Sequence, residues 1–224
     1  MRGRRLDSPA ASRSRAVHEK ARWTRRAFFF FLLAAAGTAS AEGREPVRSL
    51  LEIRQANVII QQWDVSCGAA ALATLLTYHH GDPVSERTVA QAMLGKTDPL
   101  RVKVRRGFSL LDLKRYAEAR GFQADGYAGL SLADLEELGP AIVAVNLDGY
   151  PHFVVFRARS ADRVLIADPA FGNRSVEVEL FEKAWQKIAF AVERPGGGKP
   201  ASRLGPRLQD ELRPSTEMIR SALR

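Results

Sequence analysis

The only cysteine of this 224-residue chain, Cys67, has the surroundings of a nucleophile. The residues that follow it, 69–76, are rich in Ala and Leu and predict a helix that begins at Cys67 with Ser66 as its N-cap. Cysteine attacks as the thiolate, and the positive end of the helix dipole favours that form at a helix N-terminus. An isolated cysteine is more often an inert core residue, but this position favours a catalytic one.

A thiol nucleophile needs a base, and the chain has four histidines. His18 lies in a predicted export signal. His79 and His80 follow Cys67 by 12 and 13 residues on the same predicted helix. At a rise of about 1.5 Å per residue, both lie roughly 18–20 Å from the sulfur, so we expect them to be solvated or capping residues at the helix C-terminus. His152 is therefore the predicted base.

The base also needs an orienting carboxylate, and Asp168 is the candidate. His152 begins a predicted strand, and Asp168 ends the next one. A hairpin symmetric about residue 160 places the two residues directly opposite each other on one face. This register is an assumption, because a slip of one residue breaks the pair. Asp168 would then only end a strand, and Asp148 is the alternative partner.

Acyl transfer also needs donors that stabilise an oxyanion. The backbone N–H of Cys67, at the start of a helix, is one candidate. A side-chain amide from Gln61 or Gln62 is the second, and the residue types alone leave this choice open.

The elements that must position these residues divide the chain into a helical and a β-rich half. Ser109 with Asp112 and Ser131 with Asp134 predict helix starts, and the helices are expected to end before Gly121 and at Gly139. Stretches rich in β-branched residues follow Pro140 and predict the strands 141–147, 152–158, 163–167, 175–180 and 188–193. Helices followed by an antiparallel meander indicate an α+β fold.

Several ordered motifs resemble the bacteriocin-processing double-glycine peptidases, a papain-like cysteine peptidase family. The matching segments are Gln61 six residues before Cys67, residues 78–81, 107–113, 149–155 and 167–170. The resemblance covers roughly residues 55–193. It implies a papain-like fold with Cys67, His152 and Asp168 as the catalytic residues and Gln61 in the oxyanion hole. The chain is most similar to stand-alone exported members linked to functional-amyloid secretion.

The N-terminal residues are typical of a secretory signal. Arg25 and Arg26 precede an apolar run over 27–37, and an A-x-A site follows at 39–41. The run is shorter than the about 20 residues that span a bilayer, although an uncleaved N-terminal anchor is the alternative. The paired arginines also resemble a twin-arginine signal, so the export route is open.

We therefore expect a signal peptide over 1–41, an N-terminal extension over 42–54, the peptidase domain over 55–193 and a flexible basic tail over 194–224. The predicted location is the periplasm, with no membrane span in the mature chain.

The charge distribution argues against nucleic acid as a partner. The chain has a net charge of +9, but residues 1–41 carry nine basic and two acidic residues, and 194–224 carry seven and three. Residues 42–193 are thus left with −2, whereas a nucleic-acid-binding domain carries its basic residues itself. The sequence also has no P-loop and no Cys/His cluster, so we expect neither ATP nor a metal or other cofactor.

The expected function is a cysteine endopeptidase that cleaves a secreted protein or peptide after small residues, glycine in particular. Its expected partners are that substrate and components of secretion or amyloid assembly. Two alternatives stay open: a catalytically silent binding module of the same fold, and a cell-wall amidase or acyl transferase with the same residues.

Overall fold

The computed structural model describes residues 48–147, 149–198 and 201–206. The predicted signal peptide, residues 42–47 of the predicted N-terminal extension, Asp148 and residues 207–224 of the predicted tail lie outside the described residues.

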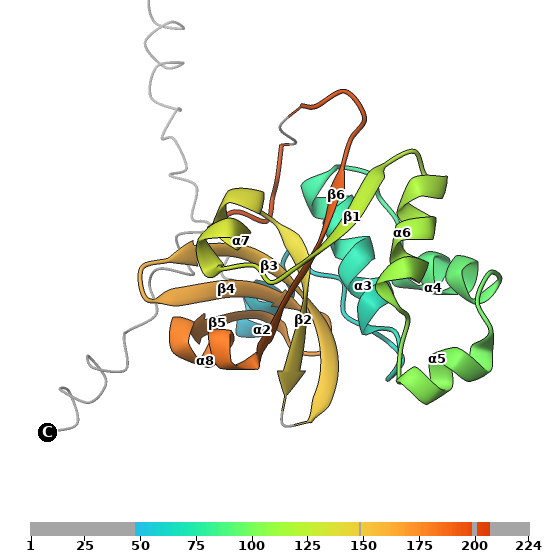
Figure 1. Cartoon of the computed structure of the whole chain (residues 1–224). Coiled ribbons are helices and arrows are strands. Elements are labelled where there is room, and N and C mark those ends of the chain that lie inside the picture. The colour runs from blue at the N-terminus through green and yellow to red at the C-terminus, as the bar shows by residue number, and fades with distance from the viewer. Residues whose placement is uncertain (1–47, 148, 199–200, 207–224) are drawn as a thin grey trace, which may run out of the picture. The chain divides into compact units, whose positions relative to one another are not determined.

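A six-stranded antiparallel sheet forms the centre of the described domain (Figure 1). Its strands lie in the order β1-β6-β2-β3-β4-β5. Their bounds are β1 Gln123–Ala128, β2 Ala141–Leu147, β3 Tyr150–Ser160, β4 Arg163–Asp168, β5 Gly172–Glu177 and β6 Trp185–Glu193. The predicted α+β class is confirmed. Strands β2 to β5 follow one another as a meander, but the last strand of the predicted meander, β6, pairs with β2 instead of β5.

Helices cover both faces of this sheet (Figure 1). The core on one face includes residues of the helices α3 Cys67–Thr74, α4 Glu86–Leu94, α5 Pro99–Arg105 and α6 Leu110–Ala119. The core on the other face includes residues of α7 Leu132–Leu138 and α8 Val178–Ala184. A short helix, α2 Leu50–Gln55, contacts β5. Buried β-branched residues alternate between the two cores, which explains why these strands read as nearly continuous apolar runs.

The predicted helix starts are present. Capping boxes at Ser109 with Asp112 and at Ser131 with Asp134 begin α6 and α7. Each serine hydroxyl accepts the backbone N–H three residues later, and each carboxylate accepts the backbone N–H of its serine. These signals are local, so they act without help from the rest of the fold.

Other elements differ from the expectation. The strand predicted over 175–180 ends at Glu177, and α8 begins at Val178. Strand β1 was not predicted, because it is an edge strand with only Ala124 buried and shows no apolar alternation. Helices α4 and α5 were also missed.

Residues 201–206 correct the prediction of a flexible tail for this part of the chain. Leu204 is fully buried, and the buried Arg157 donates to the carbonyls of Leu204 at 2.9 Å and Gly205 at 2.8 Å. The backbone N–H of Arg203 donates to Tyr78 O at 2.8 Å. The sequence did not predict this packing, because Arg157, the partner of this segment, lies 47 residues away from Leu204 in the chain.

Candidate active site

Cys67 occupies the first position of α3, as predicted, and only 5% of its surface is exposed. All eight residues of α3 are buried, so the helix that carries the sulfur is enclosed by the core. Gly68 allows this close packing, since a Cβ there would lie 3.3 Å from both Leu113 and Phe153. The thiol is thereby held at a rigid helix N-terminus.

The loop before Cys67 is held by a buried carboxylate that the sequence analysis missed. Ser66 stands at the N-cap, but its hydroxyl makes no capping bond and instead donates to Glu86. Glu86 also accepts the backbone N–H of Gln62 at 2.9 Å. Nothing in the sequence marks this role, because an acidic residue in the first turn of a helix such as α4 is common.

His152 and Asp168 form a buried pair between β3 and β4. His152 Nε2 lies 2.9 Å from Asp168 Oδ1, and both side chains are almost fully buried. The predicted facing register is wrong, however, because the hairpin turns after Ser160, which pairs with Arg163, and not about residue 160; Phe156 consequently pairs with Ile166 beyond an irregularity in β3. His152 therefore meets Asp168 diagonally, at the end of the ladder, where neighbouring strands still allow such contacts.

The Asp168 carboxylate has two further partners. Its Oδ1 accepts the backbone N–H of Ala170 at 2.9 Å, and Arg174 Nη1 on β5 lies 3.2 Å from its Oδ2. Burial on its own raises the pKa of Asp168, but the hydrogen bonds with His152, Ala170 and Arg174 lower it below its ordinary value. The carboxylate is thus ionised at neutral pH and supplies a fixed negative charge beside the imidazole.

His152 and Cys67 line the same cavity, and the interaction with the Cys67 side chain is one cause of the raised pKa of His152, so the three predicted catalytic residues lie together. Burial lowers the pKa of His152, but the hydrogen bonds to Asp168 and Cys67 outweigh burial and raise the pKa to about 9. The imidazolium is therefore the favoured form at neutral pH.

Gln61 lies beside this group. Its backbone N–H donates to Pro169 O at 2.9 Å, which ties it to the turn after Asp168. Its Nε2 donates to Trp63 O at 3.0 Å, and its Oε1 is buried without a hydrogen-bond partner among the described residues. An amide nitrogen carries two hydrogens, so one N–H of Gln61 is left for a ligand.

Two cavities meet at His152. The first, of about 260 Å³, contains Cys67, and its walls include Phe108, Pro151 and Phe153. The second, of about 570 Å³, contains Gln61, and its lining also includes Val65, Leu147, Tyr150 and Phe171. A chain lying across His152 would enter both.

The other two described histidines lie far along the helix, as predicted, but their environment differs from the prediction. The continuation of α3 is a π-helical segment, η1 Leu75–His79, with His80 as its C-cap. His80 is buried against the ring of Phe122, and its two ring nitrogens lack hydrogen-bond partners of good geometry among the described residues. Burial lowers the pKa of His79 to about 4 and also lowers the pKa of His80, so neither is a solvated imidazolium.

Residues 48–147, 149–198 and 201–206 contain neither a metal-binding cluster nor a helix that could span a membrane. No group of three or more His, Cys, Asp or Glu residues is arranged there to hold a metal ion. No helix there has the length and apolar character needed to cross a membrane.

A cysteine at a buried helix N-terminus, with a histidine of an antiparallel sheet in the same cavity, is the arrangement of the papain-like cysteine peptidases. The fold agrees with this class. The peptidase domain of Streptococcus ComA, described as a bi-functional ABC transporter involved in quorum sensing, superposes with a TM-score of 0.52. That match is 24% identical and covers 61% of this chain and 97% of the ComA domain.

The sequence comparisons identify the family. Residues 55–196 match the model of the Peptidase C39 family, and the chain therefore belongs to that family. The fold and the family match thus define a papain-like peptidase domain of the C39 type.

Two curated relatives are named "Probable functional amyloid protease FapD". The one from Pseudomonas aeruginosa is 45% identical over 147 residues, which cover 65% of this chain and 64% of that relative. The one from Pseudomonas fluorescens is 41% identical over 160 residues, which cover 71% of this chain and 70% of that relative. The chain thus spans less than two thirds of the length of the first of these proteins.

Proposed function

We propose that this peptidase is an endopeptidase in which Cys67 is the nucleophile, His152 the acid and base, and Asp168 the orienting carboxylate. The single observation that carries this proposal is the buried His152–Asp168 pair, with 2.9 Å between Nε2 and Oδ1, whose imidazole lines the cavity that contains Cys67. Because Nε2 of the imidazole faces Asp168, Nδ1 is the nitrogen that serves the sulfur.

The first half of the reaction forms a thioester. The Cys67 thiolate attacks the scissile carbonyl carbon, and the resulting oxyanion accepts hydrogen bonds from the Cys67 backbone N–H and from Gln61 Nε2. The C–N bond then breaks as His152 gives its proton to the leaving amine. The support for Gln61 is its place beside the site and its remaining amide N–H.

The second half releases the acyl product. His152 takes a proton from a water molecule, the hydroxide attacks the thioester carbonyl, and the Cys67 thiolate leaves. The product is a carboxylic acid, and the His152 imidazolium and the thiolate are restored. Asp168 stays ionised throughout and stabilises the imidazolium.

The proposed substrate is an extended segment of a secreted protein that is cleaved after glycine. The cavity that contains Cys67 is small, at about 260 Å³, and has Phe108, Pro151 and Phe153 in its walls. Such walls reject bulky side chains by clash and leave room for residues without one. The names of the FapD relatives motivate a secreted amyloid-forming protein as the substrate.

The proposed place of action is the periplasm, after export by the signal sequence and cleavage between Ala41 and Glu42. N-terminal sequencing of the exported protein tests this step. Retention of residues 1–41 would contradict it.

The decisive experiment uses the purified protein and its Cys67→Ala variant, which keeps the helix and removes the sulfur. Both are incubated with candidate secreted proteins and with a peptide library varied at the two positions before the scissile bond, and mass spectrometry maps the products. We expect cleavage after glycine by the wild type only. Binding without cleavage would favour the silent module, and amide transfer on cell-wall peptides would favour an acyl transferase.

A further inference from the structure

Arg106 lies in a tight turn beside the nucleophile and was not singled out by its sequence. It is the C-cap of α5 and adopts a left-handed conformation with φ of 58°. Glycine takes this conformation more easily than residues with a side chain, so an arginine here is an unusual choice. The next residue, Gly107, donates its N–H to Val102 O at 2.9 Å and approaches the backbone of Val65, two residues before Cys67.

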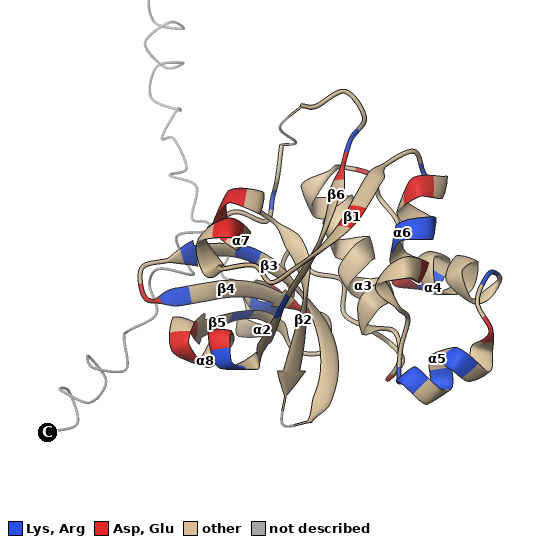
Figure 2. Ribbon diagram, viewed as in Figure 1, with Lys and Arg blue, Asp and Glu red and all other residues tan. Residues whose placement is uncertain are grey.

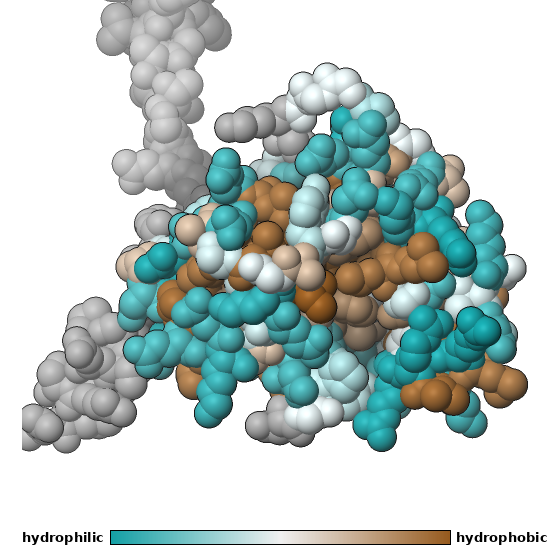
Figure 3. Space-filling view, in the orientation of Figure 1, coloured by the Kyte–Doolittle hydropathy of each residue, from teal (hydrophilic) through white to brown (hydrophobic). Residues whose placement is uncertain are grey.

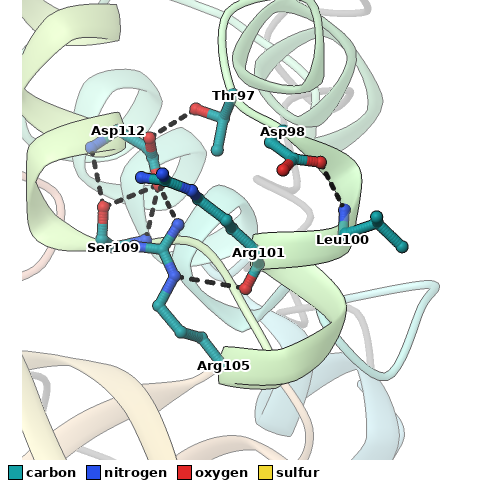
Figure 4. A network of polar contacts seen from close by, with 7 residues as sticks. All are labelled: Thr97, Asp98, Leu100, Arg101, Arg105, Ser109 and Asp112. Atoms are coloured by element: carbon teal, nitrogen blue, oxygen red, sulfur yellow. Dashed lines mark hydrogen bonds and ion pairs between the residues drawn. The ribbon is translucent and has the colours of Figure 1, made fainter.

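The two consecutive arginines at the end of α5 have different partners. Arg105 reaches the start of α6, where its Nη2 lies 3.7 Å from Asp112 Oδ2 in a network that includes Ser109 and Thr97 (Figure 4). Arg106 makes no ion pair and no side-chain hydrogen bond with the residues that the structure describes. It is exposed to solvent, and it lines both cavities that meet at His152.

Positive charge predominates around Arg106 in the two cavities that meet at His152. Among the residues that the structure describes, the cavity that contains Cys67 is lined by Arg105 and Arg106 and by no Asp or Glu. Within the same residues, the second cavity has one carboxylate, from Asp64. Basic residues also follow one another along α5 (Figure 2), and the same helix exposes Leu100 and Val104 (Figure 3). A guanidinium without a protein partner at such a place suits a carboxylate, which it can bind with two parallel hydrogen bonds.

We propose that Arg106 binds an acidic side chain of the substrate, Asp or Glu, near the scissile bond. The glycine-sized site at Cys67 and the cationic site at Arg106 then select different residues of the same extended segment. This inference rests on the proposed function for its substrate, but the binding of a carboxylate at Arg106 can be measured without turnover.

The first test uses Cys67 as its own reporter, because the chain has no other cysteine. The rates of alkylation by iodoacetate, an anion, and by iodoacetamide, its neutral analogue, are compared by intact mass. In both reactions the thiolate sulfur displaces iodide from the CH₂ carbon. The ratio of the two rates cancels the intrinsic reactivity of the thiolate and reports the preference for a carboxylate.

The variants are Arg106→Gln, Arg106→Lys and the matched control Lys103→Gln, which removes an exposed charge of α5 that lines neither cavity. We expect Arg106→Gln to lower the iodoacetate-to-iodoacetamide ratio by about fivefold, the scale of an exposed charge pair. Arg106→Lys should keep most of the preference, and Lys103→Gln should keep all of it. Added salt should weaken the wild-type preference. An unchanged ratio in Arg106→Gln overturns the inference.

The second test measures kcat/KM for peptide pairs that differ only by Asp against Asn, or Glu against Gln, at each position flanking the scissile bond. The acidic member should be preferred at one position, and Arg106→Gln should remove that preference. Equal cleavage of both members by the wild type overturns acidic selection and leaves the proposed function intact. If no peptide is cleaved but the alkylation ratio depends on Arg106, the proposed function fails and the carboxylate site stands.

Discussion

His152 Nε2 lies 2.9 Å from Asp168 Oδ1, although the two residues are not direct partners in the β3–β4 ladder. The pair stands at the end of the ladder, next to the turn that holds Gln61 through Pro169 O. Since the same imidazole lines a cavity with Cys67, the end of one hairpin positions the base, its carboxylate and the candidate oxyanion donor. We make four predictions about these residues and the fold around them.

Asp168→Asn should move the alkaline limit of activity to lower pH. The pKa of His152 is raised to about 9 by the hydrogen bonds to Asp168 and Cys67 against the effect of burial. The imidazolium is therefore present below that pH and is lost as the pH rises through 9. Without the carboxylate, fewer interactions oppose the effect of burial, and the pKa of His152 falls. At pH 8 we expect kcat/KM to drop at least about tenfold, because each unit of pKa changes the protonated fraction tenfold above the pKa.

The measurement is the pH profile of kcat/KM for the wild type, Asp168→Asn and the control Asp162→Asn, an exposed carboxylate in the β3–β4 turn. Thermal unfolding confirms that each variant is folded. A wild-type profile in Asp168→Asn would exclude Asp168 as the orienting group and direct attention to Asp148.

Gln61→Ala should lower kcat by roughly 10²–10³-fold with little change in KM, the effect of removing one oxyanion donor. Gln62→Ala is the matched control, because Gln62 is exposed and only its backbone N–H is bound, by Glu86. Steady-state kinetics on a glycine-containing peptide gives kcat and KM for both variants. If Gln62→Ala lost the activity and Gln61→Ala retained it, the oxyanion donor would have to be reassigned.

His79→Leu should keep activity and make the protein less sensitive to acid. Burial and the neighbouring His80 lower the pKa of His79 to about 4, whereas the unfolded chain has a value near 6.5. The unfolded state binds more protons between these values, so this group destabilises the fold as the pH falls from 6.5 to 4. His152 affects stability at higher pH. Because its pKa is raised from 6.5 to about 9 in the folded state, it contributes stability that is fully present below pH 6.5 and is lost as the pH rises to 9.

The check is the fall in Tm between pH 7 and pH 5, which should be smaller in His79→Leu than in the wild type. A fall of equal size would mean that His79 is accessible to protons in the folded state. A loss of peptidase activity in a folded His79→Leu protein would contradict His152 as the base.

Removal of residues 195–206 should destabilise the domain. Leu204 would leave its buried site, and the buried Arg157 would lose the carbonyls of Leu204 and Gly205. We expect a loss of at least about 2 kcal/mol, since deleting a buried leucine side chain alone costs that much. Urea unfolding of a chain ending at Arg194 is compared with one ending at Pro206, so that the difference reports this segment. Equal midpoints would show that the segment does not stabilise the domain.

The sequence by itself determined the elements whose signals are local. The helix start at Cys67, the capping boxes of α6 and α7 and the bounds of β2 follow from residues within a few positions of each other. The resemblance also predicted the C39 family and, through the order of its motifs, the candidates Cys67, His152 and Asp168.

Only the tertiary structure decided the features that depend on residues far apart in the chain. The position of the β3–β4 turn, with Ser160 opposite Arg163, and the irregularity in β3 together set the diagonal contact of His152 with Asp168, and the residue pattern of the two strands reveals neither. Burial of His80, the docking of Leu204 on Arg157 and the position of Arg106 beside Cys67 likewise need packing between distant segments. These contacts leave no periodic pattern in the sequence, because each depends on the shape of its partner and not on its neighbours along the chain.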